Sequence, residues 1–441
     1  MLEHAVTQRF RSLYAGLAFA LAECLLGTAA RAAEARRAST PEVSRPTAFR
    51  LGCSLSEPVC VHAAGDKRVP VSVAAGALEV AERTLRFLRG NDLALPIEDG
   101  ALGGGPEFDV YLSSEVTSSR AHDDPASLIG ANDSASAFGL VTTAHRGCEL
   151  ASDVARAVAQ AALIGLDPGA DGATLGIGSS QLAAVVAPCF RVEAAALDQF
   201  QRAPERALVE ATPSTFAGAA LWADYLEETY GKGGPPRLWT EFVALEGQRT
   251  PATSFVWISE PDVYDILRRL LHGLGSSLDE AGLGFAVARA FVGSRSDGNR
   301  LADTERYGDL GRVRFDWSVP ITSLPRRLRT RPIEATGATF GWLDTAGAVD
   351  TDGLVLVAEC EHTYAVRWAL VTVDGEGKEL GRHTAGRWGD DTVQISLSSL
   401  KDVAGVLVVG SVAGHDDREL PFDPDEGSVA TAVCEVTLRR D

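Results

Sequence analysis

One stretch of the sequence has the residue pattern of a metal-binding helix but lacks the metal ligands. A helix of the H-E-x-x-H type places two histidines four residues apart on one face to bind zinc, with a glutamate that polarises a water molecule. In SDVARAVAQ, residues 152–160, the histidine positions hold Ser152 and Arg156, and the glutamate position holds Asp153. A guanidinium remains cationic and repels a metal ion, so Asp153 alone cannot hold zinc.

The spacing of histidines and cysteines along the whole chain agrees with this reading. No two of the eight histidines lie three or four residues apart, and there is no C-x-x-C pair, which argues against a local zinc site. We therefore expect no metal and no cofactor. Asp153 and Arg156, three residues apart, are expected to form an ion pair. The plainer alternative is an ordinary helix-surface pair worth about 0.3 kcal/mol.

An acidic segment near the C-terminus is a second candidate for binding a cation. Asp423, Asp425 and Glu426 lie in the segment 413–427, and clustered carboxylates bind calcium in exported proteins. The D-x-D-x-D-G spacing of a calcium loop is missing from this segment. A solvated acidic loop between strands is therefore the simpler interpretation.

Aromatic and histidine side chains elsewhere have simple structural interpretations. Trp317, Trp342 and Trp368 lie on predicted strands and are expected to pack a sandwich core, with an aromatic ligand platform as the alternative. His145 and Glu149 are four residues apart, but a glycine lies between them, so we interpret His145 as a loop histidine. The chain has no G-x-S-x-G nucleophile elbow, and its GIGSS turn lacks the lysine of a phosphate-binding loop.

Length and charge limit the classes of partner. The chain has 441 residues, more than one ordinary core holds, so two domains are expected. Its 41 basic and 60 acidic residues give a formal net charge of −19. An acidic surface repels nucleic acid and anionic lipid, so neither is an expected partner. We expect an unknown protein or envelope component instead.

The first 32 residues have the features of a secretory signal peptide. Arg9 and Arg11 precede an apolar run at 13–30, and the small-x-small sequence ARA at 30–32 fits a cleavage site. The run is short and is interrupted by Glu23, which disfavours a transmembrane helix, so no membrane span is expected in the mature chain. The protein is therefore expected to be secreted or periplasmic.

The cysteine count agrees with export. Removing the signal peptide takes away Cys24 and leaves six cysteines, an even number that indicates three disulfides in an oxidising compartment. Six cysteines allow about 15 pairings, and six buried free thiols are the alternative. Proximity along the chain favours the pairs Cys53–Cys60, Cys148–Cys189 and Cys360–Cys434.

Hydrophobic periodicity divides the mature chain into a helix-rich and a strand-rich part. A polar, flexible leader at 33–50 precedes a mostly helical domain with a small sheet at 51–320. A Pro- and Arg-rich linker at 321–337 then leads to alternating strands at 338–441, which are typical of an all-β sandwich domain. The predicted fold class is therefore α+β. Its clearest segments are helices at 71–90, 149–165, 214–231, 261–275 and 277–293, and strands at 108–113 and 136–143.

The order of these segments resembles a family of secreted zinc metalloproteases found in myxobacteria, in which a zincin-like helical domain is followed by a β-sandwich. The resemblance covers residues 50–441 and rests on several soft motifs. These are FDVYLS (108–113), SAFGLVTT (136–143), RAVAQ (156–160), LDPGADG (166–172), LWADYLEETYG (221–231) and LPFDPDEG (420–427).

Carried over position by position, the resemblance implies a degenerate site. The histidine slots fall on Ser152 and Arg156, the general-base slot on Asp153, and the third-ligand slot on Ile177 or Gly178. We therefore expect a metalloprotease-like protein that has lost its zinc site and acts as a non-catalytic binding or structural protein of the envelope or extracellular space. One alternative is an active peptidase with a non-standard site. Another is a ligand-binding module that acts through the β-sandwich.

Overall fold

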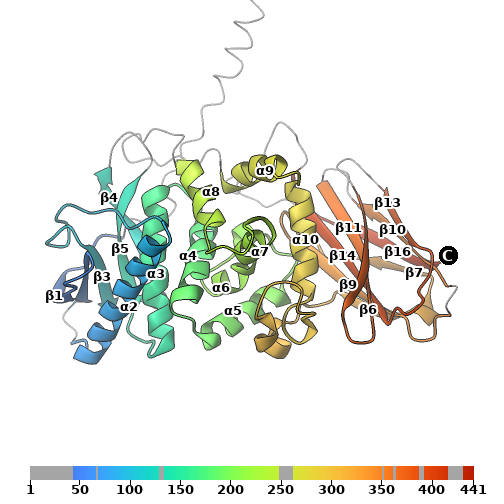
Figure 1. The fold of residues 1–441 in the computed structure, drawn as a ribbon, viewed down its shortest axis with the longest axis horizontal. Helices are drawn as coiled ribbons and strands as arrows, with labels where there is room; N and C mark the ends of the chain where they lie inside the picture. Colours follow the sequence, from blue (N-terminus) through green and yellow to red (C-terminus); the bar gives the residue numbers. More distant parts are fainter. Residues whose placement is uncertain are drawn as a thin grey trace, which may run out of the picture.

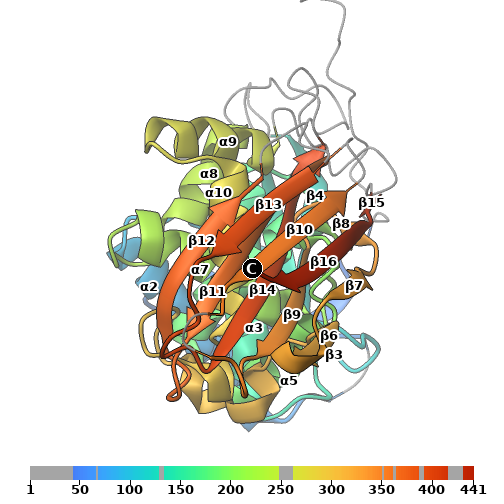
Figure 2. The same ribbon diagram turned by 90° about the vertical axis from the view of Figure 1, so that its right-hand side faces the viewer.

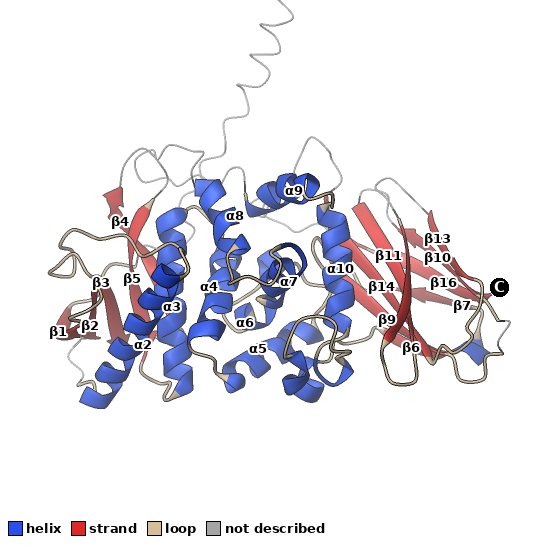
Figure 3. Cartoon of the chain, viewed as in Figure 1, coloured by secondary structure: helices blue, strands red, loops and turns tan. Residues whose placement is uncertain are grey.

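Three regions follow one another along the long axis of the molecule: a small sheet, a group of helices and a pair of packed sheets (Figures 1 and 3). The fold is α+β, as predicted, with a helical region ahead of a strand-rich C-terminal part. The signal peptide predicted at 1–32 and the calcium candidates Asp423, Asp425 and Glu426 lie outside the described residues. The structure, a computed structural model, describes residues 43–65, 68–128, 134–247, 262–349, 352–360, 364–386, 392–415 and 431–441.

The first sheet ends in an antiparallel edge strand, β4. Its order is β1-β2-β3-β5-β4, with β2, β3 and β5 parallel and both outer strands antiparallel to their neighbours. β3 and β5 are buried along their whole length, which explains their nearly continuous apolar sequences. The elements are β1 (Ala48–Cys53), β2 (Val59–Ala64), α2 (Val71–Gly90), β3 (Phe108–Ser113), β4 (Arg120–Leu128) and β5 (Ala135–Thr142).

Helix α3 (Cys148–Leu166) packs on this sheet and matches the predicted helix to within one residue at each end. Alanine has the highest helix propensity, and its small side chain lets neighbouring elements approach closely. A Cβ added to Gly139 of β5 would lie 3.3 Å from the Cβ of Ala157, so sheet and helix are in close contact there. Helix α4 (Gly172–Val186) packs beside α3, and the Asp171 carboxylate caps it by accepting hydrogen bonds from two N–H groups of its first turn.

The remaining helices share one hydrophobic core with α3, α4 and the first sheet. The segment 214–231, predicted as one helix, forms two helices, because the helix is interrupted at Ala220 between α6 and α7. Among the described residues, no helix is both long and apolar enough to cross a lipid bilayer. The helices are α5 (Phe190–Arg202), α6 (Phe216–Ala219), α7 (Leu221–Tyr230), α8 (Leu238–Gly247), α9 (Val263–Gly273) and α10 (Leu278–Ala290).

The C-terminal part is a sandwich of a four-stranded and a five-stranded sheet (Figure 2). The four-stranded sheet has the order β13-β10-β16-β7, and the five-stranded sheet has the order β12-β11-β14-β9-β6. Apolar side chains of both sheets fill the space between them. The strands are β6 (Trp317–Pro320), β7 (Arg326–Arg329), β9 (Ala338–Asp344), β10 (Leu354–Cys360), β11 (Tyr364–Val373), β12 (Glu379–Ala385), β13 (Thr392–Leu397), β14 (Gly405–His415) and β16 (Cys434–Arg440).

The central strands β9, β11 and β14 of the five-stranded sheet are buried on both faces. Along β11, Leu370 points into the sandwich core, whereas Ala369 and Val371 pack against α10 of the helical region. Successive side chains of a strand point to opposite faces, so a strand covered on both sides has apolar residues at nearly every position. Helix α10 therefore packs against both the helical region and the sandwich (Figure 1).

The segment 321–337, predicted as a linker, contributes strands to the sandwich. β7 pairs with β16, and the short strand β8 (Ile333–Glu334) pairs with β15 (Thr431–Ala432). β7 is an edge strand whose arginines are exposed and whose Leu328 packs on the core. Exposed edge strands carry charges that discourage further pairing, so their composition resembles that of a linker. Likewise, β1 begins at Ala48, inside the predicted leader.

The three predicted disulfides are confirmed. Cys53–Cys60 closes the β1–β2 hairpin, Cys148–Cys189 ties the start of α3 to the residue before α5, and Cys360–Cys434 joins β10 to β16. Each bridge lies within one region, which is why proximity along the chain identified the partners.

Candidate functional site

A cleft of about 370 Å³ lies between the edge of the first sheet and the helices. The strand β4 and the residues just before it form one wall. Helix α3, the start of α4 with its preceding loop, and Phe216 of α6 form the others. Apolar side chains such as Ile164 and Leu175 line it together with the polar Arg156 and Gln160. The cleft therefore lies over the helix stretch that the sequence marked as a candidate.

Asp153 is buried next to this cleft and is held by three side chains. Ser119 Oγ donates to its Oδ2 over 2.7 Å, and His145 Nδ1 lies 2.7 Å from the same oxygen. Arg156 Nη2 donates to Oδ1 over 2.8 Å, which confirms the predicted ion pair. These three contacts use most of the acceptor capacity of the carboxylate and fix its orientation.

Arg156 extends from Asp153 into the cleft. Its Nη2 also donates to the carbonyl oxygen of Ser119 over 3.3 Å, while its Nε and Nη1 have no acceptor among the described residues. Burial lowers the pKa of Arg156, and the Asp153 carboxylate opposes that shift. A guanidinium nevertheless stays protonated at neutral pH. The cleft floor thus presents a guanidinium, paired with Asp153, whose Nε and Nη1 face no acceptor among the described residues. The carboxylates of Asp123, Asp171 and Glu210 line the same cleft.

Gln160 lies one helical turn beyond Arg156 and contacts the same sheet edge. Its Oε1 accepts a hydrogen bond from the main-chain N–H of Ala121 over 2.9 Å. Ser119 and Ala121 are two residues apart, so their main-chain groups point to the same side of the strand. Arg156 and Gln160 together satisfy a carbonyl and an N–H of the free β4 edge, which a further strand would otherwise pair with.

The structure brings only some of the predicted site positions to the cleft. Arg156 lines it, and Asp153 is attached to Arg156. Ser152 is buried outside the lining, and Ile177 lies in the hydrophobic core. A Cβ on Gly178 would lie 2.2 Å from Cδ1 of Trp239, so no side chain fits there. A third metal ligand therefore has no place at either position that the resemblance implied.

Three residues around Asp153 and the cleft were not predicted from the sequence: Ser119, Gln160 and His145. His145 was interpreted as a loop histidine, and it does lie in the loop before α3, but its ring contacts a buried carboxylate. Gln160 carried the one available signal, since residues four apart on a helix share a face and Arg156 was already a candidate. The contact of Ser119 with Asp153 joins residues 34 apart and has no local signal.

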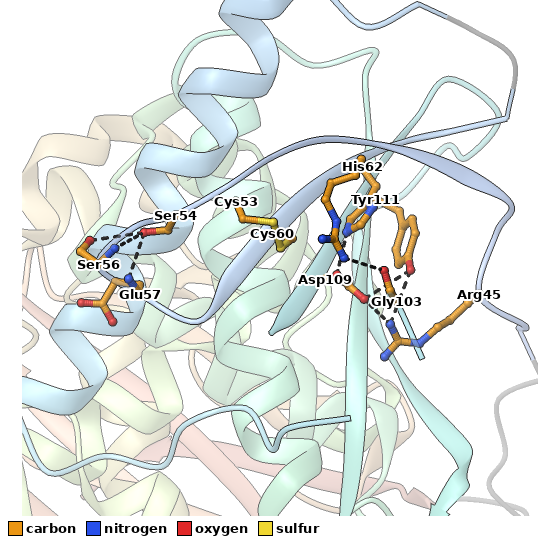
Figure 4. Close-up of a disulfide and its surroundings, with 11 residues drawn as sticks. Arg45, Cys53, Ser54, Ser56, Glu57, Cys60, His62, Gly103, Asp109 and Tyr111 are labelled. Atoms are coloured by element: carbon orange, nitrogen blue, oxygen red, sulfur yellow. Dashed lines mark hydrogen bonds and ion pairs between the residues drawn. A yellow bond between two sulfur atoms is a disulfide. The ribbon is translucent and has the colours of Figure 1, made fainter. Parts of the chain in front are cut away.

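A second cluster of charged residues attaches the N-terminal segment to the first sheet (Figure 4). Arg45 Nη1 lies 2.5 Å from Asp109 Oδ2, and its Nη2 lies 2.6 Å from Asp124 Oδ2 and also pairs with Asp99. His62 Nε2 lies 2.7 Å from Asp109 Oδ1. Burial raises the pKa of Asp99, Arg45 opposes this shift, and the Asp109 and Asp124 carboxylates add to it.

Part of this cluster has the spacing of a metal site but not its chemistry. Cys60, His62 and Asp109 place possible ligand atoms within 4.8 Å of one another. The sulfur of Cys60 is bonded to Cys53 and is no thiolate, and Asp109 is occupied by His62 and Arg45 (Figure 4). These residues do not fit a metal ion, and the cluster has a structural role.

Comparisons with known proteins do not assign the chain to a family. No family model matches it, and no curated protein matches it. A solved pre-peptidase C-terminal domain of a collagenase from Bacillus anthracis is 7% identical, covers 29% of this chain and 97% of its own, and gives a TM-score of 0.19. The enzymatically active domain of tailspike protein 4 from bacteriophage CBA120 is 8% identical, and the match covers 25% of this chain and 15% of that one. Its TM-score is also 0.19. TM-scores this low support no argument.

Proposed function

We propose that this protein is a non-catalytic binding protein on a metalloprotease-like scaffold, which holds a polypeptide segment in the cleft beside β4. The observation that carries the proposal is the pairing of Asp153 with Arg156. These residues occupy the general-base slot and the second histidine slot that the resemblance assigns, and together they form an ion pair rather than a metal site.

The chemistry of this pair argues against hydrolysis by a metal-bound water. A general base needs a lone pair directed at the water or substrate, and most acceptor sites of Asp153 are taken by Ser119, His145 and Arg156. The guanidinium of Arg156 would repel a divalent cation placed beside it. Loss of the base and of the metal ligands leaves the cleft able to bind but not to cleave.

The cleft offers the contacts that a polypeptide segment would use. Arg156 Nε and Nη1 can donate to a carboxylate or carbonyl oxygen, and charge-assisted bonds of this kind are among the stronger ones. Ile164, Leu175 and Phe216 offer apolar surface nearby. A cavity of about 370 Å³ accommodates a few residues of an extended chain rather than a folded domain. We propose as the ligand a segment that carries a carboxylate placed to meet Arg156, next to apolar side chains that meet Ile164, Leu175 and Phe216.

We also propose that the protein works outside the cytoplasm, secreted or in the periplasm. Three disulfides support this location, because such bonds persist in oxidising compartments and are rare in the cytosol. The signal-like sequence of the first 32 residues supports it independently. In this setting the cleft would meet proteins of the envelope or of the medium.

A hydrolase that uses His145 is the second candidate. His145 Nδ1 lies 2.7 Å from Asp153 Oδ2, which resembles the way a carboxylate orients a catalytic histidine, and 41% of the His145 side chain is exposed. Ser119 Oγ contacts the same carboxylate oxygen. In this arrangement the serine hydroxyl donates to Asp153 instead of to the histidine, so it is not activated as a nucleophile. The first proposal is therefore favoured.

The purified full chain tests both candidates. After dialysis against zinc and then buffer, we expect elemental analysis to find far less than one zinc per chain. We also expect no casein cleavage above that of buffer, with or without chelator. One zinc per chain, or proteolysis that a chelator abolishes, would overturn the first proposal. Hydrolysis that is insensitive to chelators and lost in His145→Ala would instead establish the second.

Binding is tested on an array of acidic, neutral and basic peptides. We expect wild type to bind acidic peptides and Arg156→Gln to lose at least about tenfold in affinity, the effect of removing one charge-assisted contact. Arg202→Gln is the matched control, because Arg202 forms an exposed pair with Asp198 outside the cleft. Equal binding by wild type and Arg156→Gln would show that the cleft is not the binding site.

A further inference from the structure

A second pocket lies at the junction of the helical region and the sandwich. It has a volume of about 510 Å³ and lies between the end of α10 and the outer face of the five-stranded sheet. Its apolar side chains include Phe291, Val373 and Leu407, which are almost fully buried. A pocket of this size, with an apolar base and a few polar groups, is typical of sites for small organic ligands.

Aromatic rings and a guanidinium form one side of this pocket. The rings of Phe315 and Trp342 are nearly parallel, at 3°, with centroids 6.1 Å apart. The guanidinium carbon of Arg295 lies 3.8 Å from the centroid of the Phe315 ring. Both rings are partly exposed and line the pocket, so a flat ligand could lie against them.

The positive charge of Arg295 has no carboxylate partner among the residues that the structure describes. Its Nη1 donates to the carbonyl oxygen of Val313 over 3.0 Å, while Nε and Nη2 face no acceptor in the described part of the chain. Arg312 lines the same pocket. Within the described ranges it pairs only with Asp309, at 3.3 Å, and the Asp309 side chain is 80% exposed. Two guanidinium groups thus share one pocket with little negative charge to balance them.

The surroundings of Arg295 support an anionic ligand. Burial, followed by the charge of Arg312, lowers the pKa of Arg295 to about 10, with Asp309 opposing. Glu376 lines the pocket, but its carboxylate lies 2.8 Å from Lys378 Nζ, which offsets its charge. A bound anion would therefore relieve the repulsion between the two arginines.

We propose that this junction pocket binds a small carboxylate carried on a six-membered ring that can lie against an aromatic side chain, either an aromatic acid or a sugar acid. The carboxylate would accept hydrogen bonds from Arg295, whose fork of N–H groups matches a carboxylate in geometry. The ring would lie against Trp342 and Phe315. This proposal is independent of the cleft, because the two pockets share no lining residue.

Calorimetric titration of the full chain tests this proposal. The probes are benzoate and glucuronate, with benzyl alcohol and glucose as uncharged counterparts and inorganic phosphate as an anion without a ring. We expect one of the two acids to bind and its uncharged counterpart to bind at least about tenfold more weakly. Binding of benzoate alone would identify an aromatic acid, and binding of glucuronate alone a sugar acid.

Two substitutions locate the site. We expect Arg295→Gln and Arg312→Gln each to weaken binding by at least about tenfold. The side chain of Arg312 is about half exposed, so we expect its replacement to keep the fold even where that of Arg295 does not. Arg202→Gln, whose side chain lies outside both pockets, serves as the control, and we expect it to bind the acid as wild type does. No binding of either acid, binding of phosphate alone, or binding by both pocket variants as tight as that of wild type would overturn the proposal.

Discussion

The Asp153 carboxylate and the Arg156 guanidinium lie 2.8 Å apart on one face of α3, and the same Arg156 nitrogen reaches the carbonyl of Ser119. One side chain thus neutralises a buried charge and holds the edge of the first sheet. This double role explains why an arginine in a helix interior is tolerated beside the cleft. It also gives the pair a measurable effect on stability.

Replacing Arg156 by leucine leaves the Asp153 charge buried with Ser119 and His145 as its remaining partners. We expect the free energy of unfolding to fall by about 3 kcal/mol, the usual effect of removing one partner of a buried pair. The double variant Asp153→Asn/Arg156→Leu should recover part of this loss, because no buried charge remains. Urea denaturation measures both effects, and Arg202→Leu, from an exposed pair, is the control. Equal losses in the Arg156 and Arg202 variants would contradict the assignment.

Replacing Gln160 removes the acceptor for the main-chain N–H of Ala121. We expect Gln160→Leu to lower stability by about 1–2 kcal/mol, because a buried donor loses its partner. Hydrogen exchange of the Ala121 amide should accelerate markedly. Gln160→Glu keeps an acceptor oxygen and should retain slow exchange at this amide. Unchanged exchange in Gln160→Leu would show that another group satisfies this N–H.

Two glycines of α4 form a matched pair for testing the packing next to the site. A Cβ on Gly178 would lie 2.2 Å from Trp239 Cδ1, whereas a Cβ on Gly172 meets no atom within 4 Å. We expect Gly178→Ala to lower the free energy of unfolding by at least about 2 kcal/mol, since the indole is buried and cannot move freely. Gly172→Ala should be neutral or stabilise by about 0.5 kcal/mol. Thermal and urea denaturation measure the stability of both variants. Similar stabilities would mean that α4 and α8 are not in close contact at Gly178.

The raised pKa of Asp224 predicts that the stability of the protein depends on pH. Burial raises its pKa to about 7, and the hydrogen bond from Gln181, 2.9 Å away, opposes that shift. In the unfolded chain this carboxyl ionises at lower pH than in the fold. The resulting loss in the free energy of unfolding therefore grows from about pH 4 to about pH 7 and is constant above. We expect Asp224→Asn to be more stable than wild type at pH 8, by an amount on the order of 1–3 kcal/mol, and similar to it at pH 4.

Urea denaturation at the two pH values checks this expectation for Asp224. Asparagine keeps an oxygen that can accept from Gln181, so the substitution changes charge and little else. Glu241→Gln, at a half-exposed carboxylate paired with Arg237, is the control and should show no such gain. A gain for Asp224→Asn that is equal at both pH values would not come from the titration of this group.

Much of the fold follows from the sequence because it depends on local signals. The helix at 71–90 was predicted to the residue, since its apolar spacing is regular. The disulfides were predictable because each joins cysteines of one region. The edge strand β7 was missed because its arginines have the composition of a linker. Its identity depends on pairing with β16, more than a hundred residues later.

The site was predictable only where its residues share a helix. The spacing of Asp153 and Arg156 gave their ion pair directly. The contacts of Asp153 with Ser119 and His145 depend on how a loop and a strand edge are placed over α3, which no local pattern encodes. Gly178 likewise could not be interpreted from the sequence, because the residue that excludes a side chain there, Trp239, lies on a different helix.

The helix α10 has a consequence for how this chain can be divided. Its residues Leu283, Ala286 and Val287 cover the outer face of the sandwich, so a cut near residue 320 would leave apolar surface bare on both fragments. Each half would need a new cover for this apolar face before recombination could pass it to another protein. Without one, the sandwich can be inherited or exchanged only together with the helix that covers it.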